Sequence, residues 1–100
     1  MIAFMMLPSK DIALEIAVRL RKRRLARQLT QEGLARRSGV ALGTLKKFER
    51  SGQIAFTSFI QLAIALQDER ALENLLGEQQ FKTLDDILQS DKLPQRGRIK

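Results

Sequence analysis

Lysine and arginine side chains carry most of the chemistry that this sequence could perform. The 100 residues have a net charge of +7, but residues 19–50 alone hold eleven bases against two acids. Residues 51–91 are acidic, with a net charge of −5. Because neutralising phosphates supplies most of the non-specific affinity for DNA, the basic block predicts a nucleic-acid interface. A basic face that is only solvated is the alternative.

Residues 42–50, LGTLKKFER, would present some of these bases on one side of a helix. Leu45 and Phe48 lie three positions apart and are expected to face the protein interior. The opposite side then carries Leu42, Gly43, Lys46, Lys47 and Arg50. A helix held in this way can enter a DNA major groove.

Catalytic and metal chemistry have few candidate residues. The chain contains no His, Cys, Tyr or Trp, which removes the thiolate and imidazole metal ligands and the commonest acid–base group. Carboxylates such as Asp85 and Asp86 remain, but they are better explained as charges at the start of a helix. We therefore expect no enzyme, no metal site and no cofactor.

The sequence also predicts no membrane span, because it lacks a continuous apolar run of about 18 residues. Met1–Leu7, MIAFMML, has neither the basic lead nor the small-residue cleavage site of a secretory signal. A cytoplasmic location is the expectation.

Residues 30–50 must position the basic helix, and their pattern is typical of two short helices joined by a tight turn. Ala35 is small where the two helices would cross. Gly39 accepts the left-handed backbone that ends the first of them. Val40 would anchor the turn in the core. These offsets predict a helix-turn-helix.

Caps and apolar spacing predict the other helices of an all-α domain with five helices. Ser9 is expected to cap a helix that starts at Lys10, and Thr30 to cap the helix Gln31–Ser38. Apolar residues at 59, 62, 63 and 66 give a fourth helix its buried face. A fifth is expected over Asp68–Leu76, ended by Gly77.

Apolar residues in the second half exceed what so small a domain can bury. We expect the surplus at a dimer interface, which comprises Ile64, Leu72, Leu75, Leu76 and Phe81.

The chain divides into an N-terminal arm (1–8), a DNA-binding domain (9–77) and a C-terminal extension (78–100). The apolar arm has the length of a strand, and it could fray, pack on its own domain or pair with a second copy. In the extension, Thr83–Asp86 is similar to a capping box and predicts a short helix to about Ser90. The basic tail from Asp91 is expected to be disordered, a secondary phosphate contact or a docking peptide.

Two sets of motifs carry a resemblance to known proteins. LTQEGLARRSGV, LKKFERSG and FIQLAIAL, within residues 20–66, resemble the Xre/Cro family of helix-turn-helix repressors, which are lambda-repressor-like and usually dimeric. The wider pattern is LPSKDIA, SGVALGTLKKFERSGQI, LENLL, FKTLDDIL and the basic tail. That pattern resembles HipB-type antitoxins, which are encoded beside HipA-like serine/threonine kinases.

The resemblance implies a homodimer that binds an inverted repeat in its own promoter and represses transcription. It also implies association with a HipA-like kinase toxin, possibly together with a small third component. A stand-alone Xre-type regulator without a toxin is one alternative. A protein-interaction module whose basic face meets an acidic partner is another.

By position, the resemblance assigns base contacts to Ala41, Leu42, Gly43, Lys46 and Lys47. We expect phosphate contacts from Arg21, Arg23, Arg24, Gln31, Arg36, Thr44 and Arg50. Gln31 could instead brace the recognition helix from behind. Since Leu42 offers only a thymine-methyl contact and Gly43 only a close backbone approach, specificity should rest largely on half-site spacing and DNA shape.

Overall fold

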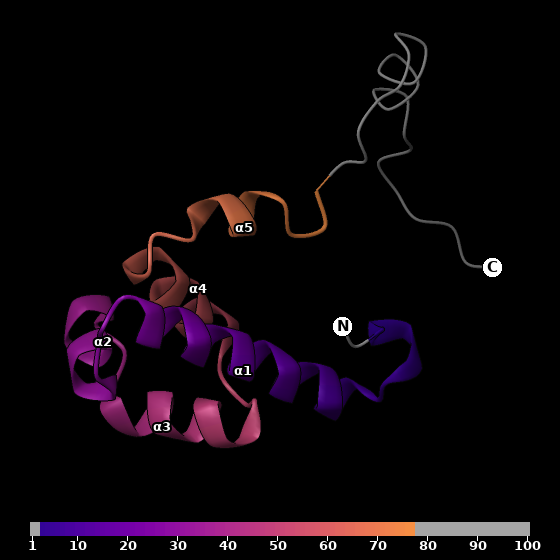
Figure 1. Ribbon diagram of the computed structural model, residues 1–100, viewed down its shortest axis with the longest axis horizontal. Coiled ribbons are helices and arrows are strands. Elements are labelled where there is room, and N and C mark those ends of the chain that lie inside the picture. The colour runs from indigo at the N-terminus through magenta and orange to yellow at the C-terminus, as the bar shows by residue number, and fades with distance from the viewer. Residues whose placement is uncertain (1–2, 78–100) are drawn as a thin grey trace, which may run out of the picture.

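Five α-helices and one short 3-10 turn make up the computed structural model, which describes residues 3–77 (Figure 1). The elements are η1 (Phe4–Met6), α1 (Ser9–Ala26), α2 (Gln31–Ser38), α3 (Leu42–Ser51), α4 (Phe56–Ala65) and α5 (Glu69–Glu73). The described residues contain no strand, so the prediction of an all-α fold with five helices is confirmed. No helix among them is both long and apolar enough to span a membrane.

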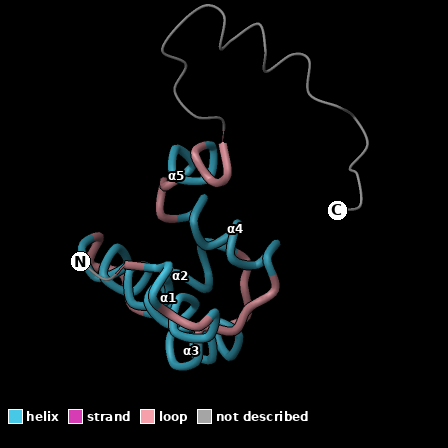
Figure 2. The backbone as a smooth tube through the Cα atoms, turned by 90° about the vertical axis from the view of Figure 1, so that its right-hand side faces the viewer, coloured by secondary structure: helices cyan, strands magenta, loops and turns pink. Residues whose placement is uncertain are grey.

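The long helix α1 runs through the middle of the molecule. Figures 1 and 2 agree that α3 lies on one side of α1 and α5 on the opposite side. α2 contacts both α3 and α4, and α4 leads into α5. This arrangement separates the surface formed by α3 from the surface formed by α5.

The core lies where α1, α2, α3 and α4 meet. Its buried side chains are Ala17, Leu20, Leu34, Ala35, Val40, Leu45, Phe48, Leu62 and Leu66. The rings of Phe48 and Phe59 pack edge to face, with centroids 5.8 Å apart. The positions predicted to hold the helix-turn-helix together, Ala35, Val40, Leu45 and Phe48, are therefore confirmed as core residues.

Caps fix both ends of α2 as the sequence predicts. The Thr30 hydroxyl accepts a hydrogen bond of 2.9 Å from the Gly33 N–H. Gly39 adopts a φ of 76°, and its N–H donates to the Ala35 carbonyl. The Ser38 hydroxyl accepts a hydrogen bond of 3.1 Å from the Val40 N–H, which stabilises the turn between α2 and α3.

The start of α1 differs from the prediction. Ser9 is already the first helical residue, and its side chain makes no capping hydrogen bond. Pro8 is the cap residue, with φ −63° and ψ 158°, and its carbonyl accepts from the N–H groups of Asp11 and Ile12. The proline ring fixes φ near this value, so the backbone enters the helix without a capping side chain.

The arm before α1 forms the turn η1 rather than a strand. The Arg19 guanidinium lies 4.7 Å from the centre of the Phe4 ring, which holds this end of the arm against α1. Met5 and Met6 are 92% and 78% exposed.

α5 is shorter than predicted, because it ends at Glu73 instead of Leu76. None of its residues is buried, and a helix of this length needs tertiary packing to persist. Leu76, with φ 52°, takes the left-handed conformation after it, rather than Gly77. Phe81, the predicted helix near Thr83 and the basic tail lie outside the described residues.

Candidate nucleic-acid interface

The outer face of α3 is basic and exposed, and its inner face is buried. Leu45 and Phe48 are 0% and 2% exposed and fix the helix on the core. Lys46, Lys47 and Arg50 are exposed. Within residues 3–77 none of these three bases is paired with a carboxylate within 4 Å. Their charges are therefore available to a polyanion.

Gly43 lies in the first turn of α3 and faces open space. A Cβ built on it would have no heavy atom within 4 Å, and its φ is not positive. Nothing in the described fold therefore requires a glycine here, although glycine costs a helix about 1 kcal/mol relative to alanine. The open space at Gly43 leaves room for a close approach from outside the protein.

The other predicted contact residues of α3 differ in how far their side chains are exposed. Ala41 is the exposed cap residue of α3, and it provides no side-chain hydrogen bond. Thr44 is half-buried at the edge. Leu42 packs against the core cluster, so much of the side chain that was expected to reach a thymine methyl is turned inward. Leu42 follows the same inward spacing as Leu45, three residues later.

A buried ion pair holds α3 to α1. The Arg24 guanidinium donates through Nε and Nη2 to the two carboxylate oxygens of Glu49, at 2.8 and 3.0 Å. Its Nη1 donates to the Leu29 carbonyl at 2.8 Å. Both side chains of the pair are at most 7% exposed. The expected phosphate contact by Arg24 does not fit this placement, because all of its donating nitrogens are engaged inside the protein.

Gln31 joins the same network from α2. Its Nε2 donates to Glu49 Oε1 at 3.1 Å, so it braces α3 from behind, the second of the two roles considered for it. Glu49 is the residue that the sequence reasoning missed. It is the single acid among the bases of α3, and this isolation was the available signal.

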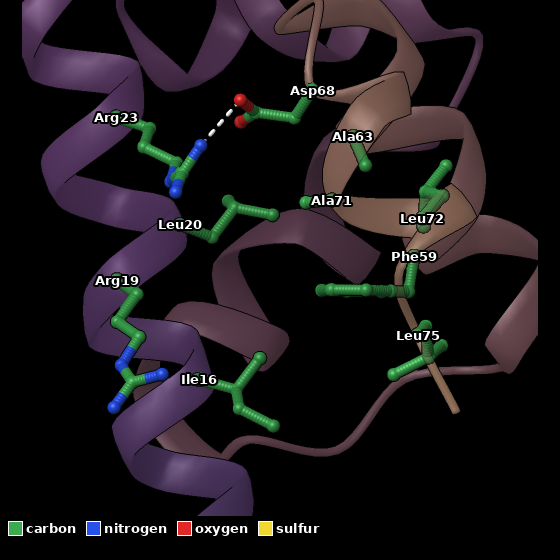
Figure 3. Close-up of a pocket in the computed structure, with 10 residues that line it drawn as sticks. All are labelled: Ile16, Arg19, Leu20, Arg23, Phe59, Ala63, Asp68, Ala71, Leu72 and Leu75. Carbon is green, nitrogen blue, oxygen red and sulfur yellow. Dashed lines mark hydrogen bonds and ion pairs between the residues drawn. The ribbon is translucent and has the colours of Figure 1, made fainter. Parts of the chain in front are cut away.

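Arg23 lies on the opposite side of α1 from α3. Its guanidinium is paired with the Asp68 carboxylate just before α5 (Figure 3). Arg27, one turn further, donates to the side chain of Gln67 at 2.9 Å. The structure therefore does not bring Arg23 together with the α3 face, and the expected phosphate contact by Arg23 does not fit. Arg21 and Arg36 are exposed.

The comparisons with known proteins agree with this architecture. A family model described as helix-turn-helix matches residues 20–69, which is half of the chain. The match runs from the second half of α1 to the first residue of α5, and it includes α2, the turn and α3. No curated protein matches the chain. The chain belongs to the Xre/Cro type of the helix-turn-helix family, the DNA-binding regulators with a lambda-repressor-like fold.

Proposed function

We propose that this protein is a sequence-specific transcriptional repressor that places α3 in the major groove of its operator. The observation that carries the proposal is the two-sided character of α3. Its inner residues are buried, whereas Lys46, Lys47 and Arg50 are exposed and have no carboxylate partner within 4 Å among residues 3–77. A helix that follows a tight turn, packs on the core with one face and exposes a basic face is the geometry of major-groove recognition.

The contacts divide into two kinds. Lys47 and Gly43 lie near the middle of the exposed face and Lys46 near its edge, so these residues meet base edges, with Ala41 at the helix start. Phosphates on either side of the groove are met by Arg50, Thr44, Arg36 and Arg21. With few base-reading side chains, the specificity relies on DNA shape and on the spacing of two half-sites.

Dimerisation supplies the second half-site in this proposal. Ile64 and Leu76 are 49% and 99% exposed, and they lie on α4 and in the turn after α5. Exposed apolar side chains of this kind are typical of an interface between two copies. Two copies related by a two-fold axis would bind an inverted repeat.

The resemblance of the wider motif pattern to HipB-type antitoxins supports a narrower role. We propose that the dimer represses its own operon as the antitoxin, or as the DNA-binding component, of a HipBA-like system. It would then associate with a HipA-like serine/threonine kinase toxin, and a small third component could share the neutralisation.

DNA binding is tested by footprinting the purified full chain on the DNA upstream of its own gene. Lys47→Ala should weaken operator binding by roughly 5- to 150-fold, because a good polar base contact contributes about 1–3 kcal/mol. It should weaken binding to random DNA less. Arg70→Ala is the control, since Arg70 is exposed on α5, away from α3. Equal losses on both DNAs would show that Lys47 is only a phosphate contact. The absence of a footprint would overturn the proposal.

The kinase partner is tested separately, by co-expressing the chain with the product of the adjacent gene. Co-purification, with tighter operator binding by the complex, supports the antitoxin role. A footprint without a co-purifying kinase would identify a stand-alone regulator. If the chain captured an acidic protein but ignored DNA, its basic face would be a protein-interaction surface.

A further inference from the structure

An apolar groove lies on the side of α1 that faces α5, opposite α3 (Figures 1 and 3). It has a volume of about 200 Å³ and is bounded by α1, α4 and the α5 region. Its apolar lining consists of Ile16, Leu20, Phe59, Ala63, Ala71, Leu72 and Leu75. The groove is not part of the α3 surface, so its occupant must be something other than the DNA that is proposed to bind α3.

The α1 rim of the groove is basic. Arg19 and Arg23 lie one helical turn apart on this rim, and their side chains are 50% and 55% exposed. Arg23 is paired with Asp68, and Arg19 is paired with Glu15 on its own helix at 3.5 Å. Exposed pairs of this kind are weak and exchange readily. The groove therefore suits an apolar helix that carries an acid at its edge.

One segment of the same chain has this chemistry. Residues 84–88, LDDIL, place Leu84, Ile87 and Leu88 at positions i, i+3 and i+4, which share one face of a helix. In such a helix Asp85 would border that face, and Asp86 would lie on the opposite face. The segment thus pairs an apolar stripe with an acid on one border.

The tether favours the chain's own segment over a separate molecule. Leu75 lines the groove, and Gly77 follows two residues later. Residues 78–83 are the only link from Gly77 to Leu84, so Leu84 can lie at most roughly 24 Å from Gly77. A short link of this kind gives an effective concentration in the millimolar range. A separate peptide at cellular concentration would compete poorly.

We infer that residues 84–88 dock as a helix in the groove of their own chain. Leu84, Ile87 and Leu88 then cover the apolar side chains between α1 and α5, and Asp85 faces the guanidinium groups of Arg19 and Arg23. This interaction does not depend on DNA binding. It assigns the segment a surface within its own domain, so any partner that captures the segment has to release it first.

The inference is tested with a spin label on the full chain. Because the chain has no cysteine, Gln89→Cys gives one attachment site for a nitroxide, on the outer side of the predicted helix. The expected result is strong paramagnetic broadening of the methyl signals of Ile16, Ala63 and Leu72, which line the groove. The methyl signals of Val40, on the α3 side, should keep their intensity.

Two further variants distinguish docking from proximity. Ala71→Glu places a carboxylate in the groove and should restore the broadened signals, whereas Arg70→Glu, its neighbour outside the groove lining, should leave them broadened. Leu88→Ser should also restore them. Equal broadening at Val40 and Ile16, or no effect of Ala71→Glu, would overturn the inference. So would broadening confined to mixtures of labelled and isotope-enriched chains, since the occupied groove would then belong to a second copy.

Discussion

Arg23 and Arg24 are neighbours in the sequence, yet their guanidinium groups serve different parts of the molecule. Arg24 is 6% exposed and makes a two-pronged ion pair with Glu49, so it ties α1 to α3. Arg23 is 55% exposed in its side chain and meets Asp68 on the opposite side of α1. Because the Arg24–Glu49 pair is buried, removing one partner is strongly destabilising. The Arg23–Asp68 pair is more exposed and contributes little to the free energy of unfolding.

Urea denaturation of matched variants measures this difference. Arg24→Met should lower the free energy of unfolding by about 3–5 kcal/mol, because Glu49 is left buried and unpaired. Arg23→Met should lower it by no more than about 1 kcal/mol. The double variant Arg24→Met with Glu49→Leu should recover much of the loss. Similar losses for the two single variants would contradict the buried role of Arg24.

Gly43 is the residue at which stability and DNA binding are expected to oppose each other. A methyl group at this position has open space and improves helix propensity, so Gly43→Ala should raise the free energy of unfolding by about 0.5–1 kcal/mol. The same methyl would meet DNA that approaches closely, so operator affinity should fall in a mobility-shift titration. A more stable variant with unchanged affinity would show that DNA does not approach Gly43 closely.

At the scale of elements, two glycines end helices in the same backbone conformation but in different surroundings. Gly39 after α2 has φ 76° with no heavy atom within 4 Å of a built Cβ. Gly52 after α3 has φ 79°, and a Cβ there would lie 2.7 Å from the backbone carbonyl carbon of Ala13 in α1. Gly52 therefore both ends α3 and allows it to approach α1.

Alanine substitutions separate the cost of the left-handed backbone from the cost of the close contact between α3 and α1. Gly39→Ala should cost about 1 kcal/mol, the penalty of a left-handed conformation alone. Gly52→Ala should cost about 2–4 kcal/mol, because the helices must also move apart. Thermal unfolding followed by circular dichroism compares them. Equal shifts in Tm would mean that the contact between α3 and α1 yields at little cost.

At the scale of the whole molecule, the positive charge is distributed over two sides of the fold. Lys46, Lys47 and Arg50 lie on α3, whereas Arg23 and Arg27 face Asp68 and Gln67 near α5. Only bases that reach phosphates release counterions when DNA binds. The net charge of residues 19–50 thus overstates the number of contacts.

The salt dependence of binding counts those contacts. The logarithm of the DNA-binding constant falls linearly with the logarithm of the salt concentration. Arg50→Ala should make this negative slope shallower by about 1, as expected for the loss of one phosphate contact. Arg23→Ala and Arg70→Ala should leave the slope unchanged, because neither lies on the α3 side. A reduced slope for Arg23→Ala would place the α5-facing side of α1 against the DNA and contradict the proposed orientation.

The sequence by itself determined the helices and the turn. Local chemistry fixes these features, because Thr30 caps α2, Gly39 takes the left-handed backbone after it, and the apolar spacing selects the buried face of α3. The end of α5 was predicted at Leu76 but lies at Glu73, because a short helix without a buried residue depends on tertiary contacts more than on its own sequence.

Only the tertiary structure decided which side chains remain available for function. Arg24 and Gln31 look like phosphate ligands in a basic sequence, but Glu49, 25 and 18 residues away, accepts their hydrogen bonds. Leu42 belongs to the face that packs on the core. Burial and ion pairing depend on contacts between residues distant in the sequence, and a local pattern of charge or spacing does not specify them.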